Sequence, residues 1–188
     1  MSNYPLPIPH KRVTRLGAMA VVVDEQQRVL LHRREIYFWW DLPGGGLEKR
    51  EDGARAAIRE TWEETGYHIA IEKFVGDYYH QSVYGFGDQL TKAYRAHVVG
   101  GAPRPYSLET LGLEWFPIDA LPRGIEPLQR QIILDAFSET DEPFTRRIEF
   151  PNWKLYPARV IFFMMRWRNF LLKPFFHHQA RQERKEKK

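Results

Sequence analysis

The sequence predicts a protein of the α/β (α+β) class, in which strands and helices alternate loosely along one chain. Short apolar runs rich in β-branched residues, bounded by turn residues, are typical of strands, and two other stretches show the periodicity of helices. The alternation contains no internal repeat. At 188 residues, 43% hydrophobic and 28% charged, the chain is long enough for one domain with its own core plus an appendage.

The first part of the chain should supply strands on either side of a tight turn. After an extended, proline-containing lead-in at residues 1–13, the apolar run that starts at Leu16 suits a buried strand, and residues 24–27 form the turn. Arg28–Arg33 is the returning strand. Tyr37–Gly46 is predicted as an aromatic strand that ends in a glycine loop, where the lack of side chains permits close approach to a ligand.

A helix is predicted at about residues 52–65, because small and apolar residues recur there at helical spacing. The expected buried stripe consists of Ala54, Ala57, Ile58 and Thr61. Gly66 follows at the position where a helix end favours a left-handed residue.

The second half should complete the domain, which is expected to span residues 14–145. Its expected elements are strands Ile69–Tyr79, Leu90–Val99 and Glu114–Pro117, and a helix Leu128–Ser138. The helix opens directly after Pro127, a residue that is favourable at a helix start.

The net charge of +4 conceals an uneven distribution. Residues 151–188 hold ten Lys and Arg against two Glu, so the rest of the chain is mildly acidic. A basic amphipathic extension is expected at 146–176 and a disordered basic tail at 177–188. The extension is too short and too charged to span a bilayer, but it could pack on the domain, form a homodimer contact, or bind a membrane surface or another anionic partner.

The chain has no cysteine, which excludes disulfides, thiolate metal sites and a cysteine nucleophile. The N-terminus lacks the apolar core of a signal peptide. A cytoplasmic location is therefore the simplest expectation, and a membrane-peripheral one applies if the basic extension binds lipid.

Three carboxylates define the candidate site. Glu60, Glu63 and Glu64 stand at i, i+3 and i+4, so they project from one face of the predicted helix. Packed carboxylates repel one another unless a cation neutralises them, and hard oxygen ligands favour Mg²⁺ or Mn²⁺. Arg59 is placed to form an ion pair with Glu51 near the helix start, which would hold the glycine loop against the helix.

The spacing of these residues is highly specific. From Gly45 to Gly66 the chain follows the pattern G-x5-E-x7-R-E-x-x-E-E-x-G. Seven fixed matches by chance are on the order of one in 10⁸ per starting position, because each residue type makes up roughly 7% or less of an average sequence. The stretch at residues 45–67 resembles the Nudix box, and the chain as a whole resembles the MutT-like Nudix hydrolases.

This resemblance implies a Nudix fold, a mixed β-sheet sandwiched between helices, and a hydrolase that cleaves a diphosphate linkage in a nucleoside diphosphate derivative. It implies that Glu60, Glu63 and Glu64 bind Mg²⁺ or Mn²⁺, with the carbonyl of Gly44 or Gly45 as a further ligand. Glu51 and Arg59 become the structural ion pair of the box. Thr61 and Tyr67 replace the bulky aliphatic residues usual at their positions, which affects packing only.

The resemblance leaves the general base open. Glu60 is the first choice, and Glu109 is the second, because related proteins can place a metal-binding glutamate on a later loop. Both residues are therefore catalytic candidates alongside Glu63 and Glu64.

The substrate is narrowed mainly by exclusion. Arg33, Arg34 and Gly45 are candidates for contact with phosphate or base. The sequence signatures of NADH, ADP-ribose and coenzyme A pyrophosphatases are missing, and an isopentenyl diphosphate isomerase would need a cysteine. Nucleoside triphosphates and dinucleoside polyphosphates remain. The alternatives are a Nudix-fold nucleotide-binding or regulatory module and a pyrophosphohydrolase acting on RNA 5′ ends.

Overall fold

The computed structural model describes residues 12–34, 40–81, 87–104, 110–149 and 160. All the helices and strands discussed below belong to one compact unit whose last residue is Ile148. Within the described residues, no helix has the length and apolar character required to cross a membrane.

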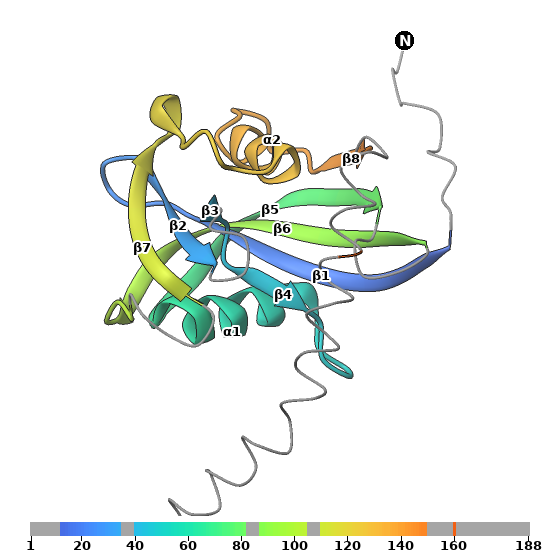
Figure 1. The fold of residues 1–188 in the computed structure, drawn as a ribbon, viewed down its shortest axis with the longest axis horizontal. Coiled ribbons are helices and arrows are strands. Elements are labelled where there is room, and N and C mark those ends of the chain that lie inside the picture. Colours follow the sequence, from blue (N-terminus) through green and yellow to red (C-terminus); the bar gives the residue numbers. More distant parts are fainter. Residues whose placement is uncertain (1–11, 35–39, 82–86, 105–109, 150–159, 161–188) are drawn as a thin grey trace, which may run out of the picture. The chain divides into compact units, whose positions relative to one another are not determined.

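The larger sheet has five strands of mixed direction (Figure 1). In spatial order they are β4 (Gly44–Gly46), β1 (Val13–Val22), β6 (Asp88–Gly101), β5 (Tyr67–Gln81) and β8 (Phe144–Ile148). The pairs β1–β6 and β5–β8 are parallel, whereas β4–β1 and β6–β5 are antiparallel. The alanines and valines of β1 are almost all fully buried, as the apolar run in the sequence predicts.

A second, smaller sheet lies beside the first and is entirely antiparallel. Its strands, in order, are β3 (Trp40–Asp41), β2 (Arg28–Arg34) and β7 (Thr110–Pro117). A single 3₁₀ turn at Ile118–Ala120 leads from β7 towards the second helix.

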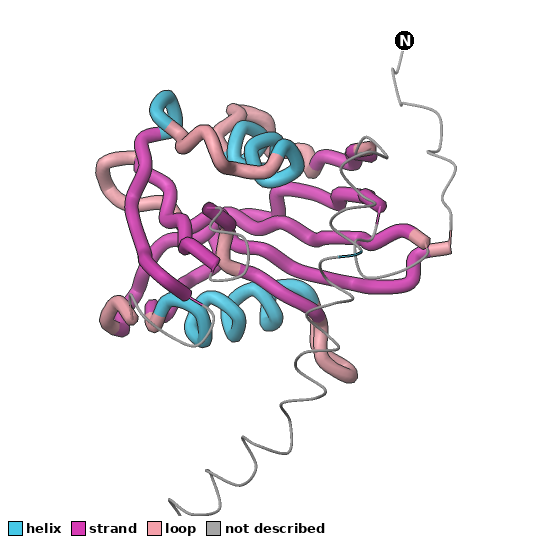
Figure 2. The backbone as a smooth tube through the Cα atoms, in the orientation of Figure 1, coloured by secondary structure: helices cyan, strands magenta, loops and turns pink. Residues whose placement is uncertain are grey.

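Two α-helices, α1 (Gly53–Thr65) and α2 (Pro127–Ala136), flank the larger sheet on opposite sides (Figures 1 and 2). The α/β (α+β) class and the helix–sheet–helix arrangement predicted from the sequence are therefore confirmed. Helix α1 begins at Asp52, whose side chain accepts from the Arg55 N–H, and it ends at Gly66 with φ of 81°, as the sequence predicts.

The buried stripe of α1 is rotated from the expected one. Ile58 is exposed, and Ala54 is only partly buried. The buried residues of the helix are Gly53, Ala56, Ala57, Thr61, Glu64 and Thr65. Small residues dominate this stripe because β1, β5, β4 and β6 pack directly against the helix; a Cβ on Gly53 would lie 2.5 Å from the Tyr94 hydroxyl.

The glycine loop expected at the end of the aromatic segment is instead a strand. Gly44–Gly46 forms β4, which pairs with Gly17–Met19 of β1. Only Trp40–Asp41 of the preceding segment is described as a strand, and residues 35–39 lie outside the described part of the chain. The glycines are needed for packing: a Cβ on Gly44 would lie 2.4 Å from the Ala18 carbonyl oxygen.

Strand β8 is an element that the sequence analysis did not predict. It runs parallel to β5, with Gly76 opposite Phe144 and His80 opposite Ile148. The strand includes residue 146, where the sequence analysis places the start of the extension. From residue 150 on, only Val160 is described, so the predicted boundaries and role of the extension stay predictions.

Two arginines of β8 attach this strand to the domain. Arg146 donates from Nε and Nη2 to the buried Asp135 of α2, at 2.6 and 2.7 Å. Asp135 also accepts from the Tyr78 hydroxyl at 2.8 Å, and burial, together with this contact, raises the pKa of Tyr78. Arg147 binds the fully buried Asp88 of β6 at 2.6 Å.

Arg146→Ala should lower the free energy of unfolding by about 1–3 kcal/mol, because it leaves the buried Asp135 carboxylate without its cation. Urea denaturation measures this change. Arg28→Ala is the control, since Arg28 pairs with Asp24 at an exposed turn and should cost about 0–1 kcal/mol. Equal losses in the two variants would show that the Arg146 contact does not stabilise the domain.

Candidate active site

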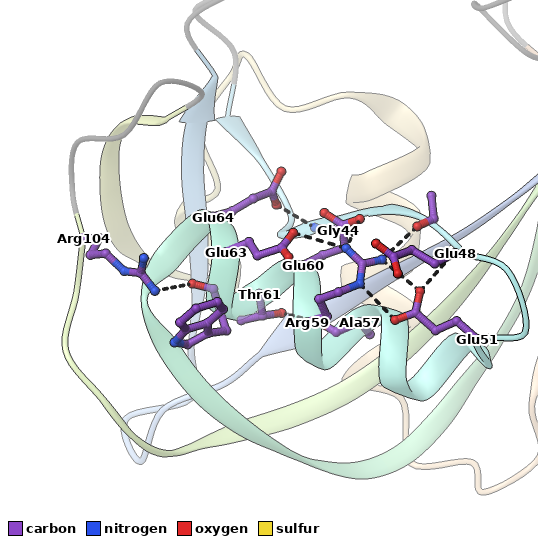
Figure 3. Close-up of polar contacts among 12 residues, drawn as sticks. Gly44, Glu48, Glu51, Ala57, Arg59, Glu60, Thr61, Glu63, Glu64 and Arg104 are labelled. Carbon is purple, nitrogen blue, oxygen red and sulfur yellow. Dashed lines mark hydrogen bonds and ion pairs between the residues drawn. The ribbon is translucent and has the colours of Figure 1, made fainter. Parts of the chain in front are cut away.

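The three glutamates lie along the face of α1 that meets β4 (Figure 3). Their environments differ sharply. The Glu64 side chain is 5% exposed, that of Glu60 is 16% exposed and that of Glu63 is 47% exposed. The three carboxylates thus differ in accessibility to solvent: Glu64 is buried, Glu60 is largely buried and Glu63 is half exposed.

Glu64 is held from the strand side. Its Oε2 accepts the backbone N–H of Gly44 at 2.8 Å, and His32 Nε2 of β2 lies 3.5 Å from the same oxygen. His32 is fully buried. The sequence analysis did not anticipate His32, and the only signal available was a polar residue ending the apolar run Val29–Leu31.

Arg59 contacts three glutamates of the box, Glu51, Glu60 and Glu63. Its Nε and Nη2 donate to both carboxylate oxygens of Glu51 at 2.9 Å, and Nη1 donates to Glu60 at 2.9 Å and to Glu63 at 3.2 Å. Nη2 also donates to the Gly46 carbonyl at 3.0 Å, which joins helix and strand. The hydrogen bonds from Arg59 hold the pKa of Glu51 below its usual value, and the carboxylates raise the pKa of Arg59.

Gly45 is the point of closest approach between β4 and Glu60. A Cβ placed on Gly45 would lie 2.4 Å from the Glu60 carboxylate. The carboxylate therefore occupies the volume that any other residue at position 45 would need. This packing, and not backbone freedom, is the reason for glycine here.

The C-terminal end of α1 is tied down by Arg104, which follows β6. The Arg104 N–H donates to the Thr65 carbonyl at 2.8 Å, and its Nη2 donates to the Trp62 carbonyl at 3.0 Å (Figure 3). Its guanidinium also stacks over the Trp62 ring, 4.6 Å from the ring centroid. These bonds satisfy carbonyls of the last helical turn, which carries Glu63 and Glu64.

The donor set has the chemistry of a site for a hard divalent cation, since it offers three carboxylates and backbone carbonyls of β4. As placed, no three acidic or imidazole side chains within the described ranges converge closely enough to hold a metal ion. In this arrangement Glu60 and Glu63 both contact Arg59. A cation would have to displace Arg59 from these two carboxylates, and Glu51 would retain it.

Comparison with known proteins decides the family. Residues 13–136 match the NUDIX domain. The chain belongs to the Nudix family.

Its relatives include hydrolases of nucleotides. The chain is 34% identical over 119 residues to a putative 8-oxo-dGTP diphosphatase of Bacillus subtilis, covering 63% of this chain and 77% of that protein. It is 30% identical over 118 residues to an RNA pyrophosphohydrolase of Roseobacter denitrificans, covering 52% and 74%. The crystal structure of a MutT NUDIX hydrolase from Burkholderia pseudomallei superposes with a TM-score of 0.56 at 30% identity, covering 64% and 96%. This Nudix protein is thus a hydrolase of pyrophosphate bonds in nucleotide derivatives, an activity for which the family generally uses divalent metal ions.

The two Nudix-box positions that depart from bulky aliphatics are both accommodated. Thr61 is fully buried, and its hydroxyl donates to the Ala57 carbonyl at 2.7 Å, so no polar atom is stranded in the core. Tyr67 packs against the core cluster and beside the Trp115 ring.

The candidate substrate contacts are only partly described. Arg33 is exposed near the end of β2, opposite Trp40 of β3. Arg34 belongs to the same strand, but its side chain lies outside the described part, as does the whole of Glu109. Their predicted roles stay predictions.

Tyr78 of β5 and Trp40 of β3 differ in whether their rings are accessible to a nucleotide base. Tyr78 is fully buried against Asp135. Trp40 is partly exposed and meets Phe116 edge to face, at 4.9 Å between centroids. Trp40 is therefore a candidate for contact with a nucleotide base, since it lies beside the exposed Arg33.

A titratable group missed by the sequence analysis lies where α2 begins. Burial and the nearby Asp41 carboxylate raise the pKa of Glu126 to about 7, and a hydrogen bond from Gln129 opposes this rise only in part. Gln129 also donates to Asp41 at 2.9 Å and accepts from the Leu42 N–H, two residues before β4. Hydrogen bonds between carboxylate and amide groups therefore hold the segment that leads into β4.

Substitution of each glycine of β4 by alanine should distinguish glycines needed for stability from the glycine needed for metal binding. Gly44→Ala should destabilise the protein, because its Cβ would meet the backbone of β1. Gly45→Ala should leave the unfolding free energy nearly unchanged but weaken binding of Mn²⁺, because only the flexible Glu60 carboxylate must move. Gly46→Ala is the control, since a Cβ there meets nothing within 4 Å. Thermal unfolding and calorimetric titration with Mn²⁺ test the three variants. Unchanged Mn²⁺ binding by Gly45→Ala would contradict a role of Glu60 as a metal ligand.

Glu126 should make stability depend on pH. Because the pKa of Glu126 is about 7 in the folded chain against 4.5 when unfolded, the folded state binds more protons between these values, and its stability falls as pH rises through about 7. The wild type should therefore lose stability between about pH 5 and about pH 8, whereas Glu126→Gln should not. The variant minus wild-type difference in unfolding free energy should be more favourable at the higher pH. Urea denaturation at both pH values measures this, with the exposed Glu139→Gln as control. A pH-independent difference would contradict it.

Proposed function

We propose that this Nudix protein is a Mg²⁺-dependent hydrolase, able also to use Mn²⁺, that cleaves a diphosphate linkage in a nucleoside triphosphate or dinucleoside polyphosphate. The observation that carries the proposal is the acidic face of α1 lying directly against β4, with Glu64 and Glu60 in contact with its first two glycines. In this arrangement carboxylates and backbone share one surface, as binding of a cation together with a phosphate requires.

Each residue has a distinct role in this proposal. Glu60, Glu63 and Glu64 would hold the cation, with the Gly44 carbonyl as a further ligand. A bound divalent cation would supply neutralisation of charge on the phosphate oxygens. Glu60 takes a proton from the attacking water. The oxygen of that water bonds to phosphorus while the P–O bond of the diphosphate breaks, and the other phosphate group leaves with the bridging oxygen. Glu109 is the alternative base.

The substrate side of the proposal rests on Arg33, Arg34 and Gly45. Arg33 is exposed and lies opposite Trp40 on the adjacent strand, so a cation and an aromatic face stand side by side there. The name of the Bacillus subtilis relative, a putative 8-oxo-dGTP diphosphatase, supports a nucleoside triphosphate.

RNA with a 5′ triphosphate is the second candidate substrate. The relative from Roseobacter denitrificans, named an RNA pyrophosphohydrolase, favours it. The basic extension could then bind the RNA backbone, and activity on RNA would fall steeply with salt. A homodimer contact or an anionic membrane contact of the extension are the other roles proposed for that segment.

A hydrolysis screen tests the function. The full chain is incubated with Mg²⁺ or Mn²⁺ and with nucleoside triphosphates, their oxidised forms, dinucleoside polyphosphates, ADP-ribose or 5′-triphosphate RNA, and products are resolved by mass. Cleavage of one class, abolished by EDTA, would establish substrate and bond. Binding of nucleotide without turnover of any substrate would instead favour the nucleotide-binding module.

Glu60→Gln should lower kcat by about 10²–10⁴-fold, because an amide accepts no proton at neutral pH. Glu64→Gln should abolish metal-dependent turnover, and since Gln retains an oxygen for the Gly44 N–H, the fold should persist. The rate measurements use the substrate found in the screen, with circular dichroism as the check on folding. Glu25→Gln, at an exposed turn, is the control. A near-normal kcat for Glu60→Gln would transfer the role of base to Glu109.

A further inference from the structure

His32 is a polar exception in the core of the smaller sheet. It follows Val29, Leu30 and Leu31 on β2, and all four residues are fully buried. An apolar side chain would be the usual occupant of such a position, because burying an imidazole costs free energy unless a polar partner receives it. The Glu64 carboxylate lies close to this imidazole, with 3.5 Å between His32 Nε2 and Glu64 Oε2.

The backbone holds His32 firmly in place. It lies opposite Asp41 on one neighbouring strand and opposite Leu113 on the other, so hydrogen-bonded ladders flank it on both sides. The imidazole therefore reaches from the smaller sheet to the helix that carries the glutamates. Its position does not depend on a loop.

Two groups converge on the same oxygen of Glu64. The Gly44 N–H donates to Oε2 from β4, and His32 Nε2 approaches Oε2 from β2. The hydrogen bond from Gly44 holds Oε2, and the close imidazole limits the space into which the carboxylate can turn. Its other oxygen, Oε1, then has a set direction, which is the arrangement that lets outer groups tune the ligands of a metal.

We propose that His32 is a positioning residue that orients Glu64 for cation binding through the contact of its Nε2 with Glu64 Oε2. This inference rests on the proposed function, in which Glu64 is a ligand. It assigns to a residue outside the Nudix box a share in the metal affinity of the site. Loss of an outer-shell contact of this type typically lowers metal affinity by about 10–100-fold.

The test compares two polar replacements of similar burial cost. The amide nitrogen of Gln reaches about as far as Nε2 of histidine, whereas that of Asn stops near the position of Nδ1. His32→Gln should keep most of the affinity for Mn²⁺, and His32→Asn should raise the Kd by about 10–100-fold. Affinity is measured on the full chain without substrate, by calorimetry or by the electron paramagnetic resonance of free Mn²⁺.

A second buried histidine provides the matched control. His80 on β5 is buried, and its Nε2 contacts the Thr91 hydroxyl at 3.0 Å. His80→Asn should cost stability without changing the Kd for Mn²⁺. If His32→Asn and His80→Asn both leave that Kd unchanged while Glu64→Gln weakens it, the role of His32 is overturned and the metal role of Glu64 stands. If Glu64→Gln also binds Mn²⁺ normally, both proposals fail.

Discussion

The contact between the glycine strand β4 and helix α1 is the constraint on which the rest of the site depends. Strand β4 is enclosed on two sides, because a side chain on Gly44 would meet the backbone of β1 and one on Gly45 would displace Glu60 of α1. Apart from Glu64, the buried stripe of the helix consists of small residues, namely glycine, alanine and threonine. Close backbone packing here is what brings carboxylates and peptide groups onto one surface.

Arg59 offsets the electrostatic cost of this packing. Carboxylates crowded on one helical face repel one another. A single guanidinium contacts two of them, Glu60 and Glu63, together with Glu51 ahead of the helix and a carbonyl of the strand. The planar fork of arginine allows this geometry, because its nitrogens donate in several directions at once. Glu51 receives the paired, two-oxygen contact, so it can keep Arg59 in place when the other carboxylates turn elsewhere.

The sequence predicted the fold class, both helices and most strands, because these depend on local periodicity and capping. It also placed Glu51 within reach of Arg59, since Glu51 stands just ahead of the helix that carries Arg59. It misplaced the buried stripe of α1 and missed β8, because both are decided by what packs against them from distant parts of the chain. Strand β8 has only five residues, and three of them have charged or hydroxylated side chains, so its sequence alone gives little indication of a strand.

The same limit applies to the candidate site. Glu60, Glu63 and Glu64 could be assigned from their spacing, but nothing in that spacing distinguishes a 5% exposed carboxylate from a 47% exposed one. His32 and Glu126 acquire their surroundings only through tertiary packing, from β2 against α1 and from α2 against β3. Glu109 and the side chain of Arg34 fall outside the described residues, so their assignment still rests on resemblance.

The order of the larger sheet has a consequence for how the chain acquires its structure. The parallel partner of β1 begins at Asp88, and the parallel partner of β5 begins only at Phe144, beyond the end of the NUDIX match at residue 136. Pairings between such distant segments form slowly, because the intervening chain must first be closed into a loop. During synthesis, β5 therefore presents an unpaired edge until the last strand has left the ribosome, and a chain ending at residue 136 would present that edge permanently, as a surface prone to aggregation.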